Sequence, residues 1–156
     1  MNRDRVKNIL RYCRDIDSEI KYYKKQIQDY EDIYYNTSGC IVYDNAPKVE
    51  RKITSPVESA ALNIPDHVSA KIHRLNEKIT ELEVLKSEIM QELSKLRYIQ
   101  KSILHDKYIN GFQWVRISAQ KHYSVTQCKN IRNQGLDKLA EYFAKNALIE
   151  SFNYPK

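Results

Sequence analysis

Residues 112–139 read FQWVRISAQKHYSVTQCKNIRNQGLDKL, and this stretch decides the fold of the C-terminal part of the chain. Apolar and small residues recur at helical spacing in two bursts, one before and one after "KHYS". Ser124 directly precedes the second burst, where its hydroxyl can accept from unpaired backbone N–H groups of a helix start. The spacing predicts a short helix, a tight turn and a longer helix. The expected inward residues are Trp114, Ile117 and Ser118, then Cys128, Ile131, Gly135, Leu136 and Leu139.

The start of the second helix has an outward face that suits contact with DNA bases. Gln and Asn can bond bidentately to adenine, Thr can touch the thymine methyl group, and Lys can reach guanine or a phosphate. Four cations, Arg116, Lys121, Lys129 and Arg132, are expected near the phosphates. The alternative is a helical hairpin whose charges are merely solvated. The residues predicted to face DNA are Arg116, Lys121, Ser124, Val125, Thr126, Gln127, Lys129, Asn130, Arg132 and Asn133.

Positive charge is concentrated in the same region. The chain of 156 residues has a formal net charge of +6, and residues 107–145 carry seven basic against two acidic residues. This segment therefore accounts for nearly all of the excess. A concentrated basic patch favours a polyanionic partner, and double-stranded DNA is the partner that the outward side chains fit.

The N-terminal part carries two long apolar stripes with the alternating three- and four-residue steps of a coiled-coil seam. Lys86 and Gln100 stand at positions of the second stripe where apolar residues are expected. The first stripe comprises Val6, Ile9, Cys13, Ile16, Ile20, Tyr23, Ile27, Tyr30 and Tyr34. The second begins just past Pro65 and comprises Val68, Ile72, Leu75, Ile79, Leu82, Ile89, Leu93, Leu96 and Ile103.

These patterns predict an all-α fold in which long N-terminal helices form a coiled-coil-like hairpin or bundle, followed by a helix-turn-helix domain. We expect a helical oligomerisation region over residues 1–96, with a helix at about 3–35, a loop at 36–65 and a long helix from about 66. The DNA-binding domain is expected over 97–145 and a tail over 146–156. The narrow stripe favours association into a homo-oligomer, a dimer or tetramer. Packing of the long helices on the C-terminal module is the alternative.

No pattern of an enzyme stands out. The four histidines and three cysteines lack metal-ligand spacing, and neither a phosphate-binding glycine loop nor a nucleophile motif is present. We therefore expect no catalytic residue, no metal and no cofactor. An odd number of distant cysteines and the lack of a signal or membrane-spanning pattern predict a cytoplasmic protein without a membrane partner.

Residues 97–143 resemble region 4 of bacterial sigma factors, and the match runs without gaps from Gln113 to Leu139. Its apolar and capping positions correspond to Ile117, Tyr123, Ser124, Cys128, Ile131, Leu136 and Leu139. With the long helices before it, the chain resembles phage-encoded late-gene transcriptional regulators of the ArpU and RinA type. The resemblance implies an activator of phage late genes that binds DNA in the bacterial host and has host RNA polymerase as a second partner.

Two residues depart from the sigma-factor pattern. Lys121 stands where an inward leucine is usual, and His122 stands at a usual turn glycine. This predicts either an early end of the first helix or a reshaped turn. Two other functions fit the residues: a phage DNA-packaging component similar to a small terminase subunit, and a helical scaffold without DNA affinity.

Overall fold

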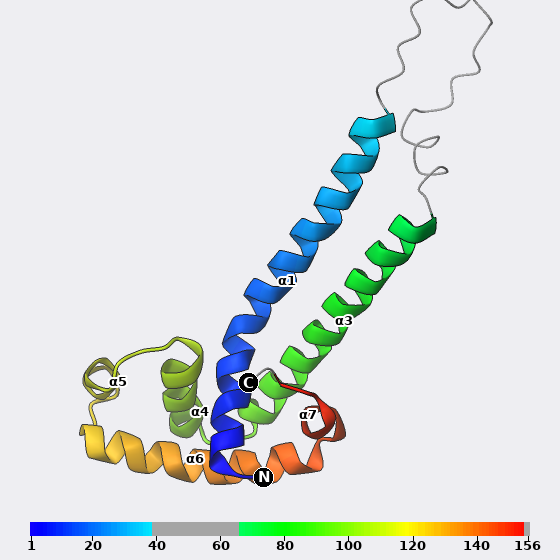
Figure 1. The fold of residues 1–156 in the computed structure, drawn as a ribbon. Coiled ribbons are helices and arrows are strands. Elements are labelled where there is room, and N and C mark those ends of the chain that lie inside the picture. Colours follow the sequence, from blue (N-terminus) through cyan, green and yellow to red (C-terminus); the bar gives the residue numbers. More distant parts are fainter. Residues whose placement is uncertain (39–65, 155–156) are drawn as a thin grey trace, which may run out of the picture. The chain divides into compact units, whose positions relative to one another are not determined.

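The computed structural model describes residues 1–38 and 66–154, and all regular structure in them is helical (Figure 1). The all-α prediction is therefore confirmed. The first helix ends a turn later than expected, and the loop predicted from residue 36 lies, from residue 39 on, outside the described residues. The elements are α1 (Arg3–Ser38), α3 (Asp66–Ser94), α4 (Tyr98–Leu104), the π-helix η1 (His105–Ile109), α5 (Trp114–Lys121), α6 (Val125–Lys145) and α7 (Ala147–Ser151).

The chain divides into two compact units, and both long helices run through the division. Unit 1 combines Met1–Glu19 with Glu81–Lys156, and unit 2 is Ile20–Thr80. The predicted domain boundary near residue 96 does not coincide with this division. The first half of α1 and the last part of α3 share a core with the C-terminal helices, because α1 presents Leu10 beside the narrow stripe and so buries a broader face there.

The core of unit 1 brings together side chains from its N-terminal and C-terminal segments. Phe143 is the largest fully buried side chain. Truncating such a residue to alanine costs about 3–5 kcal/mol of folding free energy, since it leaves a cavity. The fully buried core residues from the long helices are Val6, Ile9, Leu10 and Ile16 of α1 and Leu85, Ile89 and Leu93 of α3; Leu136, Leu139 and Phe143 come from α6.

Unit 2 is an antiparallel pair formed by the second half of α1 and the first part of α3. Lys78 Nζ lies 5.6 Å from the ring centroid of Tyr23, and Lys71 Nζ lies 5.5 Å from that of Tyr30. Ile20 is buried and Tyr23 and Tyr30 are half-buried. The predicted stripe of α1 is therefore buried or half-buried from Val6 to Tyr30, and at Tyr23 and Tyr30 it faces α3. The side chain of Tyr34 lies outside the described part.

The two polar residues on the second stripe have different surroundings, both within unit 1. Lys86 pairs with Asp17 across the two long helices, with 2.5 Å between Nζ and Oδ1. Gln100 is buried, at 4% exposure, and its Oε1 has no hydrogen-bond partner among the described residues. Lys86 therefore fixes the register of the pair at this level.

The predicted C-terminal tail is folded through Tyr154. Asn146 caps α7, since its Oδ1 accepts a hydrogen bond from the Ile149 backbone N–H at 3.2 Å, and Ile149 is fully buried. The rings of Phe152 and Tyr154 pack against Tyr12 of α1, with centroids 5.8 and 5.7 Å away. Apolar contact with α1 thus orders a segment too short to show a helical period.

Candidate nucleic-acid interface

The turn between α5 and α6 is built around His122. Its φ of 58° is left-handed, and its backbone N–H bonds to the Ser118 carbonyl, as in a helix ending in glycine. Histidine is among the residues that enter this region more readily than most. Helix α5 therefore runs to Lys121, and His122 adopts the backbone conformation expected of the glycine that it replaces.

Ser124 caps α6, as predicted. Its Oγ accepts a hydrogen bond from the Gln127 backbone N–H at 3.1 Å, and its own carbonyl accepts from the Cys128 N–H at 2.9 Å. The cap determines where the helix begins, and hence which side chains its first turns expose. The hydroxyl predicted to face DNA thus has a structural partner in the protein itself.

Behind the turn, a small apolar cluster holds α4, α5 and α6 together. Ile103, Ile117 and Cys128 are fully buried, and Ile131 packs on them while half-buried. Burial raises the pKa of the Cys128 thiol, which keeps it neutral. At Gly135 a Cβ would lie 2.9 Å from Leu104 Cδ1, so glycine permits the close approach of α6 to α4. These inward positions are confirmed.

Lys121 is not the exposed cation that its predicted contact with phosphate assumed. Its Nζ lies 2.8 Å from Asp106 Oδ2, and the two side chains are only 19% and 13% exposed. Asp106 also accepts from Asn110 Nδ2 through Oδ1, at 3.0 Å, and from the Phe112 N–H through its carbonyl, at 2.9 Å. The ion pair thus occupies an inward position and joins η1 to the end of α5.

Asp106 is the residue that the sequence analysis missed. It is the only acidic residue in residues 93–136, a strongly basic segment, and this was the available signal. The sequence also predicts an inward position for its partner Lys121. A lone carboxylate and an inward lysine form a natural pair, because neither charge can be buried alone without a large desolvation cost.

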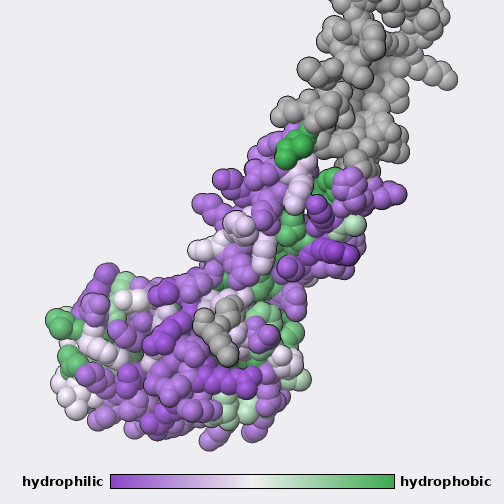
Figure 2. Space-filling view, in the orientation of Figure 1, coloured by the Kyte–Doolittle hydropathy of each residue, from purple (hydrophilic) through white to green (hydrophobic). Residues whose placement is uncertain are grey.

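The outward face of α6 contains the side chains predicted to contact bases. Thr126, Gln127, Lys129 and Asn130 are exposed on its first two turns. Val125 is half-buried and lies at the edge of this face. Figure 2 shows hydrophilic residues over much of unit 1 along α6. The structure thus brings these four of the ten predicted contact residues together on one accessible surface.

Three cations lie over two aromatic rings beside this face, and we call these five residues the cation–aromatic cluster: Lys107, Phe112, Trp114, Arg116 and Arg132. Arg116 Cζ lies 3.7 Å from the Phe112 ring centroid. Lys107 Nζ and Arg132 Cζ each lie 5.2 Å from the centroid of Trp114. The rings hold the cations near fixed positions, which lowers the conformational entropy that they lose on meeting an anion.

Asn133 is engaged by this cluster. Its Oδ1 accepts from Arg132 Nε at 3.1 Å and from Nη2 at 2.8 Å. Asn133 is half-buried, so its side-chain oxygen is already used within the protein. Its clearest role is to orient the Arg132 guanidinium, in place of the direct contact with a base that was predicted for it.

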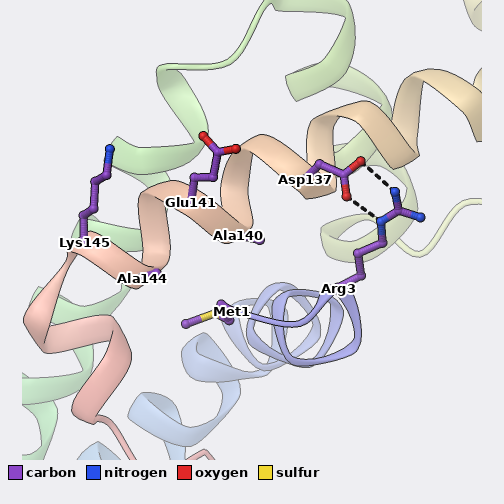
Figure 3. A pocket seen from close by; sticks show the side chains of 7 residues that line it. All are labelled: Met1, Arg3, Asp137, Ala140, Glu141, Ala144 and Lys145. Carbon is purple, nitrogen blue, oxygen red and sulfur yellow. Dashed lines mark hydrogen bonds and ion pairs between the residues drawn. The ribbon is translucent and has the colours of Figure 1, made fainter.

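The second half of α6 is anchored to the start of α1. Arg3 Nε and Nη2 donate to the two carboxylate oxygens of Asp137, at 2.5 and 2.7 Å (Figure 3). This contact lowers the pKa of Asp137. An open groove of about 590 Å³ lies here, with charges of both signs at its edge. Its lining residues are Met1, Arg3, Asp137, Ala140, Glu141, Ala144 and Lys145.

Comparisons of the chain with family models, with curated proteins and with solved structures found no match. The resemblance to sigma region 4 and to the phage regulators therefore stays a prediction. None of the described helices is both long and apolar enough to cross a membrane. In residues 1–38 and 66–154, no group of three or more His, Cys, Asp or Glu side chains is arranged to hold a metal ion.

Proposed function

We propose that the protein is a sequence-specific DNA-binding transcriptional regulator that inserts the first turns of α6 into the major groove. The observation that carries this proposal is the exposed set Thr126, Gln127, Lys129 and Asn130 on those turns. Each of these side chains can bond to, or contact, a base edge or a phosphate. The set lies on a helix whose start is held by the Ser124 cap, so its orientation is fixed before DNA is bound.

The proposed role of each side chain in DNA binding follows from its surroundings. Gln127 and Asn130 are three residues apart on α6 and can reach neighbouring base pairs. Lys129 is exposed and bears a charge suited to a phosphate. The cation–aromatic cluster supplies further positive charge beside the same helix, and cations already in position are suited to backbone contacts that set the docking orientation.

The biological role proposed here is activation of phage late genes, which rests on the resemblance described above. Host RNA polymerase is then a second partner, and Val115 of α5, which is 75% exposed, offers an apolar contact beside the DNA-binding face. Figure 2 shows hydrophobic residues at the end of unit 1 where α5 lies.

The test is selection of bound fragments from a library of random duplexes, followed by fluorescence anisotropy on the selected site and on a scrambled duplex. Gln127→Ala or Asn130→Ala should weaken binding to the selected site by about 1–3 kcal/mol and leave binding to the scrambled duplex nearly unchanged. Gln91→Ala provides a matched control, because Gln91 is exposed on α3 and is not part of the outward face of α6. Selection of no sequence, or equal affinity of all variants for the selected site, would contradict base reading by α6.

A further inference from the structure

The second half of α1 carries a stripe on a face other than the one that packs against α3. Tyr22, Gln26, Asp29 and Ile33 are separated by steps of four, three and four residues, so they share one side of the helix. Tyr22 is 59% exposed and Ile33 is 65% exposed. Gln26 Nε2 donates to the Tyr22 hydroxyl at 2.9 Å, which holds the tyrosine ring along the stripe.

The order of residues along this stripe is self-complementary. Tyr22 and Ile33 are equally far from its middle, and so are Gln26 and Asp29. When a second copy runs antiparallel, Tyr22 faces the partner's Ile33, and Gln26 faces the partner's Asp29. The first pairing is aromatic against aliphatic and the second is an amide donor against a carboxylate. A two-fold axis repeats both pairings, as an isologous interface requires.

Charge along α1 has the same symmetry. Residues 21–25 hold three lysines and no acid, whereas residues 29–32 hold three acids and no base. In a parallel pair of copies like charges would meet, whereas in an antiparallel pair each lysine block meets an acidic block.

Lys25 and Asp32 are the charges best placed for this contact. They are seven residues apart and flank the stripe on the side away from Tyr23 and Tyr30, the residues that meet α3. Residues at such flanking positions face each other between antiparallel helices. Within the described residues, neither Lys25 nor Asp32 is engaged in an ion pair of its own.

We infer that the protein forms an antiparallel homodimer through this stripe, with Tyr22 packed on the partner's Ile33 and with Lys25 paired with the partner's Asp32. The contact uses a different face from the one that closes the α1–α3 pair, so both exist together. It is independent of DNA binding. Because the flanking pairs are exposed, the apolar pairings supply most of the affinity and the charges supply the direction of pairing.

The experiment is sedimentation equilibrium of the full chain without DNA, over a range of concentrations up to about 100 μM, in a buffer of low ionic strength so that charge is weakly screened. The wild type should rise from the chain mass of 18.5 kDa toward twice that value. Lys25→Glu and Asp32→Lys should each raise the dissociation constant about tenfold, since either change makes both symmetric pairs repulsive.

The double variant Lys25→Glu with Asp32→Lys restores opposite charges and should dimerise within about threefold of the wild type. Lys24→Glu and Glu31→Lys are the matched controls. They make the same charge changes one residue away, on other faces of the helix, and should leave the dissociation constant within about twofold. Circular dichroism should give the same helix content for every variant, because the altered side chains are exposed.

Three outcomes would overturn the inference. A wild type that stays monomeric up to about 100 μM rejects the homodimer, and this face of α1 would then have to be covered by something other than a second copy. A dimer that tolerates both single reversals uses another surface, such as the exposed part of α5. Failure of the double variant to regain the dimer, with helix content unchanged, rejects the antiparallel pairing itself. Each outcome is read without DNA, so failure of this inference and failure of the proposed DNA binding are distinguishable.

Discussion

Asp106 and Lys121 form an ion pair in the interior of the helix-turn-helix, with 2.8 Å between Oδ2 and Nζ. The pair joins the π-helix η1 to the last turn of α5, directly before the left-handed His122. It therefore controls the geometry of the turn that leads into α6. Where sigma region 4 is expected to pack a leucine, this chain uses two opposite charges.

Asp106→Ala should destabilise the protein by about 3 kcal/mol, because it leaves the Lys121 ammonium largely buried without its partner. Adding Lys121→Leu to this variant should recover most of the loss, since an apolar side chain then fills the inward position. Urea denaturation followed by circular dichroism measures both changes. An Asp106→Ala variant as stable as the wild type would show that the pair has no structural role.

The salt dependence of DNA binding should distinguish Lys129 from Lys121. Lys129→Ala should lower the slope of log affinity against log salt concentration by about one, because one phosphate contact and its released counterion are lost. The double variant Asp106→Ala with Lys121→Leu should leave the slope unchanged, since the Lys121 ammonium is held by Asp106 and removing both leaves no buried charge. Fluorescence anisotropy at several salt concentrations gives both slopes. Equal decreases would place Lys121 at the phosphates after all.

Trp114 should support DNA binding without contributing charge. Trp114→Ala removes the ring that holds Lys107 and Arg132, and we expect affinity to fall about fivefold, which corresponds to about 1 kcal/mol. The salt slope should stay the same, because the cations remain. Trp114→Phe, which keeps an aromatic face, is the control and should lose less affinity. A changed slope for Trp114→Ala would mean that the ring determines how many phosphates are contacted.

The C-terminal segment should make stability depend on pH in the alkaline range. Burial raises the pKa of Tyr154 to about 12, and its hydroxyl donates to the Ile149 carbonyl at 3.1 Å. A raised pKa means that its contribution is fully present below the ordinary tyrosine value near 10 and is lost as pH rises toward 12. Urea denaturation between pH 9 and about 12 should therefore show a steeper loss for the wild type than for Tyr154→Phe. Parallel curves would argue against this linkage.

Local periodicity explains how much could be predicted from the sequence. The stripe of α1, the cap at Ser124 and the inward positions of Ile117 and Cys128 depend on residues a few positions apart, so spacing alone predicts them. The Asp106–Lys121 pair depends on a π-helix and on a contact across the turn, which no helical period encodes. The division into units depends on pairing between the two ends of the chain.

Helix α7 was not predicted, because it too depends on contacts that no local helical period encodes. Five residues are too few to establish a period, and its order comes from Ile149 entering the core and from Phe152 and Tyr154 packing on Tyr12. At the candidate interface, the surroundings of a side chain were predicted better where exposure alone was at issue, as at Gln127. They were predicted less well where neighbours occupy the side chain, as at Asn133.

The discontinuity of unit 1 has a consequence for how the protein is made. The ribosome delivers Val6, Ile9 and Ile16 well before their partners in the C-terminal helices emerge. At roughly 5–20 residues per second, the stretch from Ile16 to Leu136 delays their meeting by about 6–24 seconds. During that interval the nascent chain presents an unmatched apolar face to its surroundings. Residues up to Ile149 must thus be translated before unit 1 can fold, and prematurely terminated chains carry the first helix without its core.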